Sequence, residues 1–136
     1  MRRGDQRKQA VFALYQHDLT GRAFDELIES DASAFTRELV SGTAAAQDQL
    51  DEMISANSKD WSLDRIAPLE RNILRVALFE LTTRFDVPVE VAIDQAVELT
   101  KRYCSADAPA FVNGILGSAL RSLPARPADS ADEARK

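Results

Sequence analysis

The 136-residue sequence has almost none of the residues that build disulfide, zinc or nucleophilic sites. Cys104 is its single cysteine and His17 its single histidine. One cysteine cannot form an intramolecular disulfide, which favours a reducing, cytoplasmic location. The same scarcity excludes a zinc site built from several cysteines and histidines.

Glycine and long apolar runs are also scarce. The five glycines are scattered, so the chain has no glycine-rich phosphate loop and no Gly-x-Ser-x-Gly turn for a nucleophilic serine. No apolar run approaches the roughly 20 residues that span a bilayer, and no secretory signal follows the charged start. These absences predict a soluble protein that is not an enzyme, binds no cofactor or metal and does not enter a membrane.

The charge is acidic overall, with a net value of −5, yet positive residues gather at the N-terminus. Arg2, Arg3, Arg7 and Lys8 are opposed there only by Asp5. Because phosphates respond to local patches rather than to net charge, this arm is a candidate phosphate-binding segment. A solvated, frayed chain end is the alternative interpretation.

Apolar residues recur at helical spacing along nearly the whole chain, which predicts an all-α fold of about seven helices. The first helix should end at Gly21 in a left-handed cap. After a short segment over residues 24–30, Ser33 should cap a long helix whose buried stripe reaches residue 54. Gly42 inside that helix lowers its stability, which indicates close packing at this position.

The second half of the chain contains a helix with an unusual pattern. Residues 68–84 carry apolar side chains on most of the helix circumference, with Pro68 at the start, so this should be the central helix. Helices over residues 89–103 and 108–123 follow, the last with Asp107 as its expected N-cap. A single helical turn is expected over residues 62–66, after a connector at residues 57–60.

We therefore expect one domain over residues 1–123, built from two packed helical sub-bundles. The sub-bundles should cover about residues 1–58 and 60–123. Residues 124–136 are rich in Ala, Asp, Glu and Ser and are predicted to form a disordered tail.

Three stretches of the sequence together resemble the NusB family. They are residues 7–15 (RKQAVFALY); residues 69–81 (LERNILRVALFEL), leading into DVP at 86–88; and residues 91–101 (VAIDQAVELTK), followed by FVNGIL at 111–116. The third pair is the most specific, because order, spacing and residue types all match. The resemblance runs from about residue 2 to 123, although residues 20–57 match only in helical pattern.

This resemblance implies both a fold and a function. The fold is that of two helical bundles, which the periodicity predicts separately. The function is the binding of boxA-type single-stranded RNA jointly with the ribosomal protein NusE. That complex supports antitermination by RNA polymerase during ribosomal RNA synthesis.

The resemblance also implies site residues. Those that match the RNA face are Arg2, Arg3, Arg7, Lys8, Tyr15, Glu70, Tyr103 and Phe111. Those on segments that resemble the NusE-facing side are Arg75, Phe79 and Asp107. Basic side chains attract phosphates, aromatic rings stack on unpaired bases, and a carboxylate accepts from base amino groups.

Each of these side chains also has a simpler structural interpretation. Phe111 begins the apolar stripe of its helix and Tyr15 belongs to another, so both are candidates for the core. Glu70 has the place of a first-turn charge favoured by the helix dipole. For Asp107 the simpler interpretation is that of an N-cap with no partner-binding role.

The chain departs from the family pattern in its positive charge. Gly4, Asp5 and Gln6 interrupt the basic arm, and Ala110 stands where a basic residue would add a phosphate contact. We therefore expect NusE to be needed for tight RNA binding.

Two other functions remain open. One is an RNA-binding module of a ribosomal RNA methyltransferase, which is disfavoured because little sequence follows the last helix. The other is a homo-oligomeric adaptor, such as a homodimer, that does not bind RNA. Phe12 and Phe79 are candidates for exposed aromatic residues at its interface.

Overall fold

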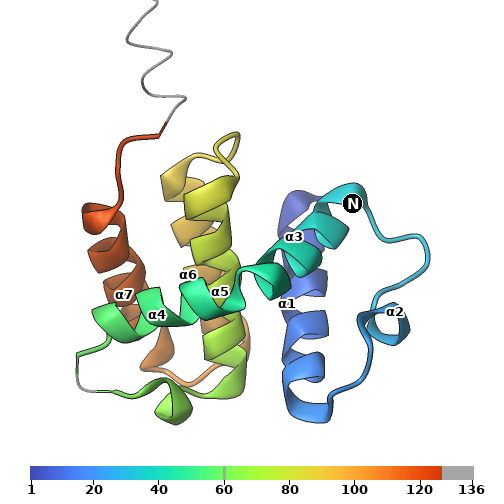
Figure 1. The fold of residues 1–136 in the computed structure, drawn as a ribbon, viewed down its shortest axis with the longest axis horizontal. Coiled ribbons are helices and arrows are strands. Elements are labelled where there is room, and N and C mark those ends of the chain that lie inside the picture. The colour runs from blue at the N-terminus through green and yellow to red at the C-terminus, as the bar shows by residue number, and fades with distance from the viewer. Residues whose placement is uncertain (60, 127–136) are drawn as a thin grey trace, which may run out of the picture.

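A computed structural model describes residues 1–59 and 61–126, and within these ranges the secondary structure is entirely helical (Figure 1). The helices are α1 (Arg3–Thr20), α2 (Phe24–Leu27), α3 (Ala34–Ala45), α4 (Gln47–Asn57), α5 (Pro68–Thr83), α6 (Val89–Tyr103) and α7 (Ala108–Ser122), with a 3-10 turn η1 (Leu63–Arg65) before α5. The all-α prediction is confirmed. No helix in the described ranges is long and apolar enough to cross a membrane.

Several helices begin and end at the residues that the sequence predicts. Gly21 ends α1 with φ 72°, and its N–H donates to the carbonyl of His17. The Ser33 hydroxyl accepts from the N–H of Thr36 at the start of α3. Pro68 lies in the first turn of α5. Asp107 occupies the N-cap position of α7, although its carboxylate accepts no capping hydrogen bond.

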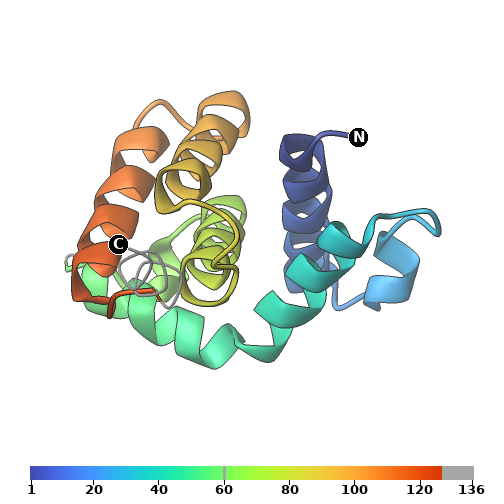
Figure 2. The same cartoon turned by 90° about the horizontal axis from the view of Figure 1, so that it is seen from above.

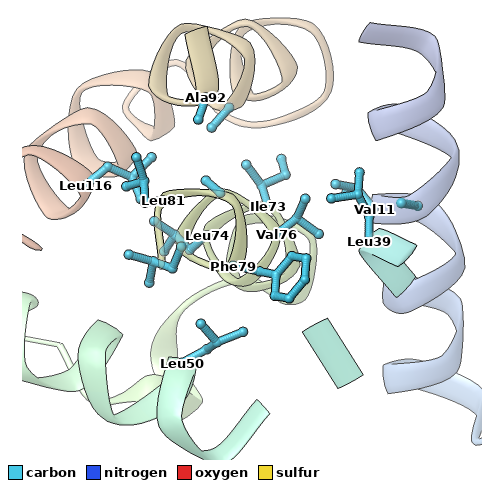
Figure 3. Close-up of a cluster of buried hydrophobic side chains, with 14 of the residues drawn as sticks. Val11, Leu39, Leu50, Ile73, Leu74, Val76, Phe79, Leu81, Ala92 and Leu116 are labelled. Carbon is cyan, nitrogen blue, oxygen red and sulfur yellow. The ribbon is translucent and has the colours of Figure 1, made fainter. Parts of the chain in front are cut away.

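Helix α5 is the centre of the molecule, as its apolar circumference predicts. Figure 3 shows its side chains pointing outward toward every neighbouring helix. Ile73 and Val76 lie toward Val11 of α1, while Leu81 lies toward Leu116 of α7. All residues from 72 to 81 are buried. The core therefore surrounds a single helix.

The predicted long third helix is two helices. The break lies at Ala46, where φ is −98° and ψ 10°. Backbone hydrogen bonds from Ala46 to Gly42 and from Leu50 to Ala46 keep the apolar spacing almost continuous across the break. For this reason, the spacing of apolar residues does not reveal the break at Ala46.

The break also moves the division between the two helical groups. Helix α3 packs on α1 and α5, whereas α4 packs on α5 and α7. As Figure 2 shows, α1, α2 and α3 form one group and α4 to α7 the other. The division therefore falls near residue 46 rather than near residue 58. The predicted tail lies mostly outside the described residues; of it, residues 124–126 are described and are not helical.

Candidate nucleic-acid and protein interface

The basic N-terminal arm forms the first turns of α1, and its cations have different surroundings. Arg2 is exposed and Lys8 half-buried, and neither makes an ion pair in the part of the chain that the structure describes. Arg3 lies 3.4 Å from Asp86 and stacks over the Phe35 ring at 4.3 Å, with about half of its side chain exposed. Arg2 and Lys8 are therefore the available cations of this arm.

Arg7, in contrast, points into the protein. Its Nε donates to both carboxylate oxygens of Glu80, at 2.9 and 3.0 Å, and its Nη2 lies 2.8 Å from Oε1. Arg7 is only 4% exposed. Burial raises the pKa of Glu80, and the Arg7 guanidinium opposes that rise. The guanidinium thus links α1 to α5 and is turned away from any surface phosphate.

A groove lies between the start of α1 and one side of α6, from Val91 to Arg102. Arg2, Lys8 and Arg102 line it, together with the acidic side chains of Asp5 and Glu98. Arg102 is exposed and makes no ion pair among the described residues. Arg102 is not among the predicted RNA-binding residues, because the spacing within residues 89–103 shows only that its side chain lies away from the apolar face. Its position across the groove from Lys8 depends on how α1 and α6 pack.

Tyr15 and Tyr103 come together through a third aromatic residue, Phe12. The ring centroids of Phe12 and Tyr103 are 5.2 Å apart and those of Phe12 and Tyr15 6.3 Å, both in edge-to-face geometry. Tyr103 is 41% exposed, so it presents aromatic surface to solvent. Phe12 is half-buried, and its ring belongs to this cluster.

Glu70 and Phe111 line a second groove, which also contains Trp61, Arg65 and Asp107. The Trp61 and Phe111 ring centroids are 6.5 Å apart. Burial raises the pKa of Glu70. Trp61 is 50% exposed. It is not among the predicted site residues, because a tryptophan in a connector has no periodic pattern around it.

The two aromatic regions meet at the end of α6. Cys104 follows Tyr103 directly, and the pKa of its thiol is raised to about 11 by burial and, secondarily, by the negative charge of Glu70. Ser105, which follows Cys104, lines the second groove together with Glu70, so this groove begins just after the end of α6. The basic groove, the Phe12 cluster and the second groove thus follow one another along α1, the end of α6 and the starts of α5 and α7.

The three candidates for the protein-partner side do not share a surface. Arg75 is 5% exposed, and its guanidinium binds both carboxylate oxygens of Asp51, at 2.7 and 3.0 Å. Phe79 is 8% exposed and packs against Gly42. The prediction that Phe79 is an exposed aromatic is wrong, because α5 is surrounded by other helices and leaves no solvent-facing strip there. Asp107 is exposed, in the second groove.

Comparison with known protein sequences gives consistent matches. The model of the NusB family matches residues 5–121. The transcription antitermination protein NusB of Bacillus subtilis (strain 168) is 42% identical over 123 residues, which cover 87% of this chain and 94% of that protein. The protein of the same name from Myxococcus xanthus (strain DK1622) is 39% identical over 123 residues, covering 81% and 88%.

Solved structures with the same architecture include NusB proteins. T. maritima NusB superimposes with a TM-score of 0.81 and 31% identity, over 89% of this chain and 92% of that one. A crystal structure of the antitermination factors NusB and NusE in complex with dsRNA contains a chain with a TM-score of 0.78 and 27% identity. That match covers 90% of this chain and 100% of the other.

Proposed function

This chain belongs to the NusB family of transcription antitermination proteins, a non-enzymatic family, and we propose that it binds boxA-type single-stranded RNA together with the ribosomal protein NusE. Its place of action would be the RNA polymerase antitermination complex during ribosomal RNA synthesis, in the cytoplasm. The related crystal structure of NusB and NusE in complex with dsRNA supports the choice of NusE and of RNA as partners.

The observation that carries the proposal is that cations without ion pairs among the described residues lie on the same face as an aromatic cluster, of which Tyr103 is exposed. Arg2, Lys8 and Arg102 line one groove, and the cluster of Phe12, Tyr15 and Tyr103 continues the same face. A basic groove follows the phosphates of a single strand, while aromatic rings stack on its bases. The RNA would therefore run from the start of α1 across the end of α6.

The same geometry predicts modest affinity for the isolated protein. Because Arg7 is held by Glu80 and Arg3 contacts Asp86, few cations remain for phosphates. The net charge of −5 repels RNA at longer range. We propose that NusE supplies the missing binding surface. Asp107 remains a candidate contact for this partner, whereas Arg75 and Phe79 would act only indirectly, through the packing of α5.

The test is a titration of fluorescently labelled boxA-type RNA, with and without NusE, at two salt concentrations. Lys8→Ala and Arg102→Ala should each weaken binding and lower the slope of log K against log salt by about 0.7, the value for one lost phosphate contact on a single strand. Arg121→Ala is the matched control, because Arg121 is an exposed arginine on α7 that lines neither groove.

Scrambled and double-stranded RNAs complete the experiment. Sequence-selective binding that NusE tightens is the expected result. Binding that is the same with and without NusE would contradict the partner requirement. Absence of binding to every RNA would overturn the proposal and favour the homo-oligomeric adaptor, whose oligomeric state light scattering would then report.

A further inference from the structure

Three arginine side chains surround the Phe35 ring, where the start of α1, the start of α3 and the turn between α5 and α6 meet. The guanidinium carbons of Arg3, Arg7 and Arg84 lie 4.3, 5.2 and 5.1 Å from the ring centroid. Positive charges gathered around one ring repel one another, so each arginine depends on a carboxylate to stay there. The contacts with these carboxylates show which arginine is able to leave.

Arg7 and Arg84 are firmly held. The pair formed by Arg7 and Glu80 is almost wholly buried, with side-chain exposures of 5% and 1%. Arg84 donates to both carboxylate oxygens of Asp86, at 3.0 and 2.9 Å, and pairs with Glu38 of α3. The hydrogen bonds from Arg84 lower the pKa of Asp86 well below its usual value, so the Asp86 carboxylate stays negatively charged at neutral pH.

Arg3 is held more weakly. It has one carboxylate contact among the described residues, at 3.4 Å between its Nη1 and Oδ2 of Asp86, and about half of each side chain is exposed. Exposed ion pairs contribute little free energy, because water screens the charges and both side chains lose freedom. If Arg3 moves away, Asp86 keeps both hydrogen bonds from Arg84, so no charge is left without a partner. Arg3 is therefore the exchangeable cation of the three.

A phosphate is a suitable replacement for the Asp86 carboxylate. The guanidinium fork of arginine matches the oxygens of phosphate as well as those of carboxylate. Arg3 follows Arg2 in the chain, and Arg2 lines the basic groove that the proposed RNA strand follows. Arg3 also lies in the first turn of α1, so a change of rotamer can turn its long side chain toward such a strand while the helix stays in place.

We propose that Asp86 is an internal competitor of RNA: it holds Arg3 in the free protein, and an RNA phosphate takes its place when RNA binds. The affinity for RNA is then lower than it would be with Arg3 unpaired, by the free energy of the ion pair between Arg3 and Asp86. Asp86 thereby sets how much positive charge the start of α1 offers. This inference rests on the proposed RNA-binding function and adds to it a residue that limits the affinity.

The test removes the Asp86 charge and measures the binding of boxA-type RNA in the presence of NusE. Asp86→Asn should tighten binding by up to about fivefold, which corresponds to one exposed ion pair. Glu90→Gln is the matched control, because Glu90 is an exposed carboxylate in the first turn of α6 with no ion pair among the residues that the structure describes. It removes the same charge close to the same turn and should tighten binding less, by the screened long-range effect alone.

A double-mutant cycle shows whether the gain comes through Arg3. Arg3→Ala should weaken binding and lower the slope of log K against log salt by about 0.7, the loss of one phosphate contact. In the Arg3→Ala background, Asp86→Asn should give no more than the gain of Glu90→Gln. An equal gain with and without Arg3 would overturn the proposal. So would an Arg3→Ala variant with wild-type affinity and salt slope while Lys8→Ala weakens binding, a result that would leave the proposed function intact.

Asp86→Asn also alters the contact with Arg84, so urea unfolding should first show that this variant is folded. NMR of the arginine Nε–H groups in the wild-type protein gives a test that needs no Asp86 variant. The Arg3 signal should shift when RNA and NusE are added, whereas the Arg7 signal should stay in place. An Arg3 signal that does not move while RNA binds would overturn the proposal. Absence of binding to any RNA, with NusE included, would remove both the proposal and the function on which it rests.

Discussion

Gly42 of α3 lies directly against the aromatic ring of Phe79 on α5. A Cβ atom placed on Gly42 would overlap the Phe79 ring carbons. Glycine at this position allows α3 to approach α5 closely, which explains a residue that is unfavourable inside a helix. The contact joins α1–α3 to the central helix.

Gly42→Ala should therefore destabilise the protein even though alanine is the better helix former. Overpacking costs about 1–3 kcal/mol, and the gain in helix propensity offsets about 1 kcal/mol of it. We expect a lower midpoint in urea unfolding. Gly114→Ala on α7, where nothing lies within 4 Å of the added Cβ, is the control and should be stabilising. Addition of Phe79→Leu should recover part of the loss in Gly42→Ala, and strict additivity would contradict the contact.

Arg7→Met should reduce the free energy of unfolding by about 3–5 kcal/mol, because it leaves the Glu80 carboxylate buried without its partner. Arg7→Met/Glu80→Met should regain most of that loss, since an apolar pair replaces a buried ion pair at little cost. Chemical denaturation measures both variants. If Arg7→Met retained full stability and lost RNA affinity, Arg7 would belong to the RNA face after all.

Asp18→Asn should destabilise the protein at neutral pH by about 1–2 kcal/mol. Burial raises the pKa of Asp18, but hydrogen bonds from Arg71 and Asn72 outweigh it and hold the pKa below the ordinary 3.8. A carboxyl whose pKa is lower in the folded than in the unfolded state stabilises the folded protein at a pH above its unfolded-state pKa. This contribution is lost as the pH falls through the folded-state pKa. The difference between wild type and Asp18→Asn should therefore shrink below about pH 3.8.

Thermal unfolding over a pH series measures this difference. Asp25→Asn, at an exposed carboxylate of α2, is the control and should track the wild type throughout. A difference that persists unchanged into acid would show that Asp18 acts by its shape and not by its charge.

Glu70→Gln should raise the melting temperature at pH 7. Burial raises the pKa of Glu70 above the ordinary 4.5, so the folded state favours the protonated carboxyl. This preference for the protonated carboxyl stabilises the folded protein at a pH below the unfolded-state pKa. The stabilisation is lost as the pH rises through the folded-state pKa. The gain from Glu70→Gln should therefore be present at pH 7 and absent at pH 3.

Glu52→Gln, at an exposed carboxylate of α4, provides the comparison for this prediction. If Glu70→Gln lowered the melting temperature at pH 7, the interaction of the charge with the start of α5 would outweigh its desolvation. The predicted result would mean that a binding residue is kept at a cost in stability, as expected for a group that meets its partner only in the complex.

The helices themselves follow from local chemistry. The left-handed end at Gly21 and the hydroxyl cap at Ser33 depend on their nearest neighbours along the chain. The central place of α5 follows from its apolar circumference, and the motifs at residues 91–101 and 111–116 identify the family. Each of these features depends on residues close together in the sequence, so the spacing of residue types is enough to predict it.

The candidate site depends on relations between helices, which spacing does not contain. The same basic segment sends Lys8 to the surface and Arg7 to Glu80, because only the packing of α1 on α5 decides which cation is covered. Arg102 faces Lys8, and Trp61 lies beside Phe111, across elements far apart in the sequence. Helical periodicity shows which residues share a face, whereas tertiary packing decides which faces meet and which charges are left free.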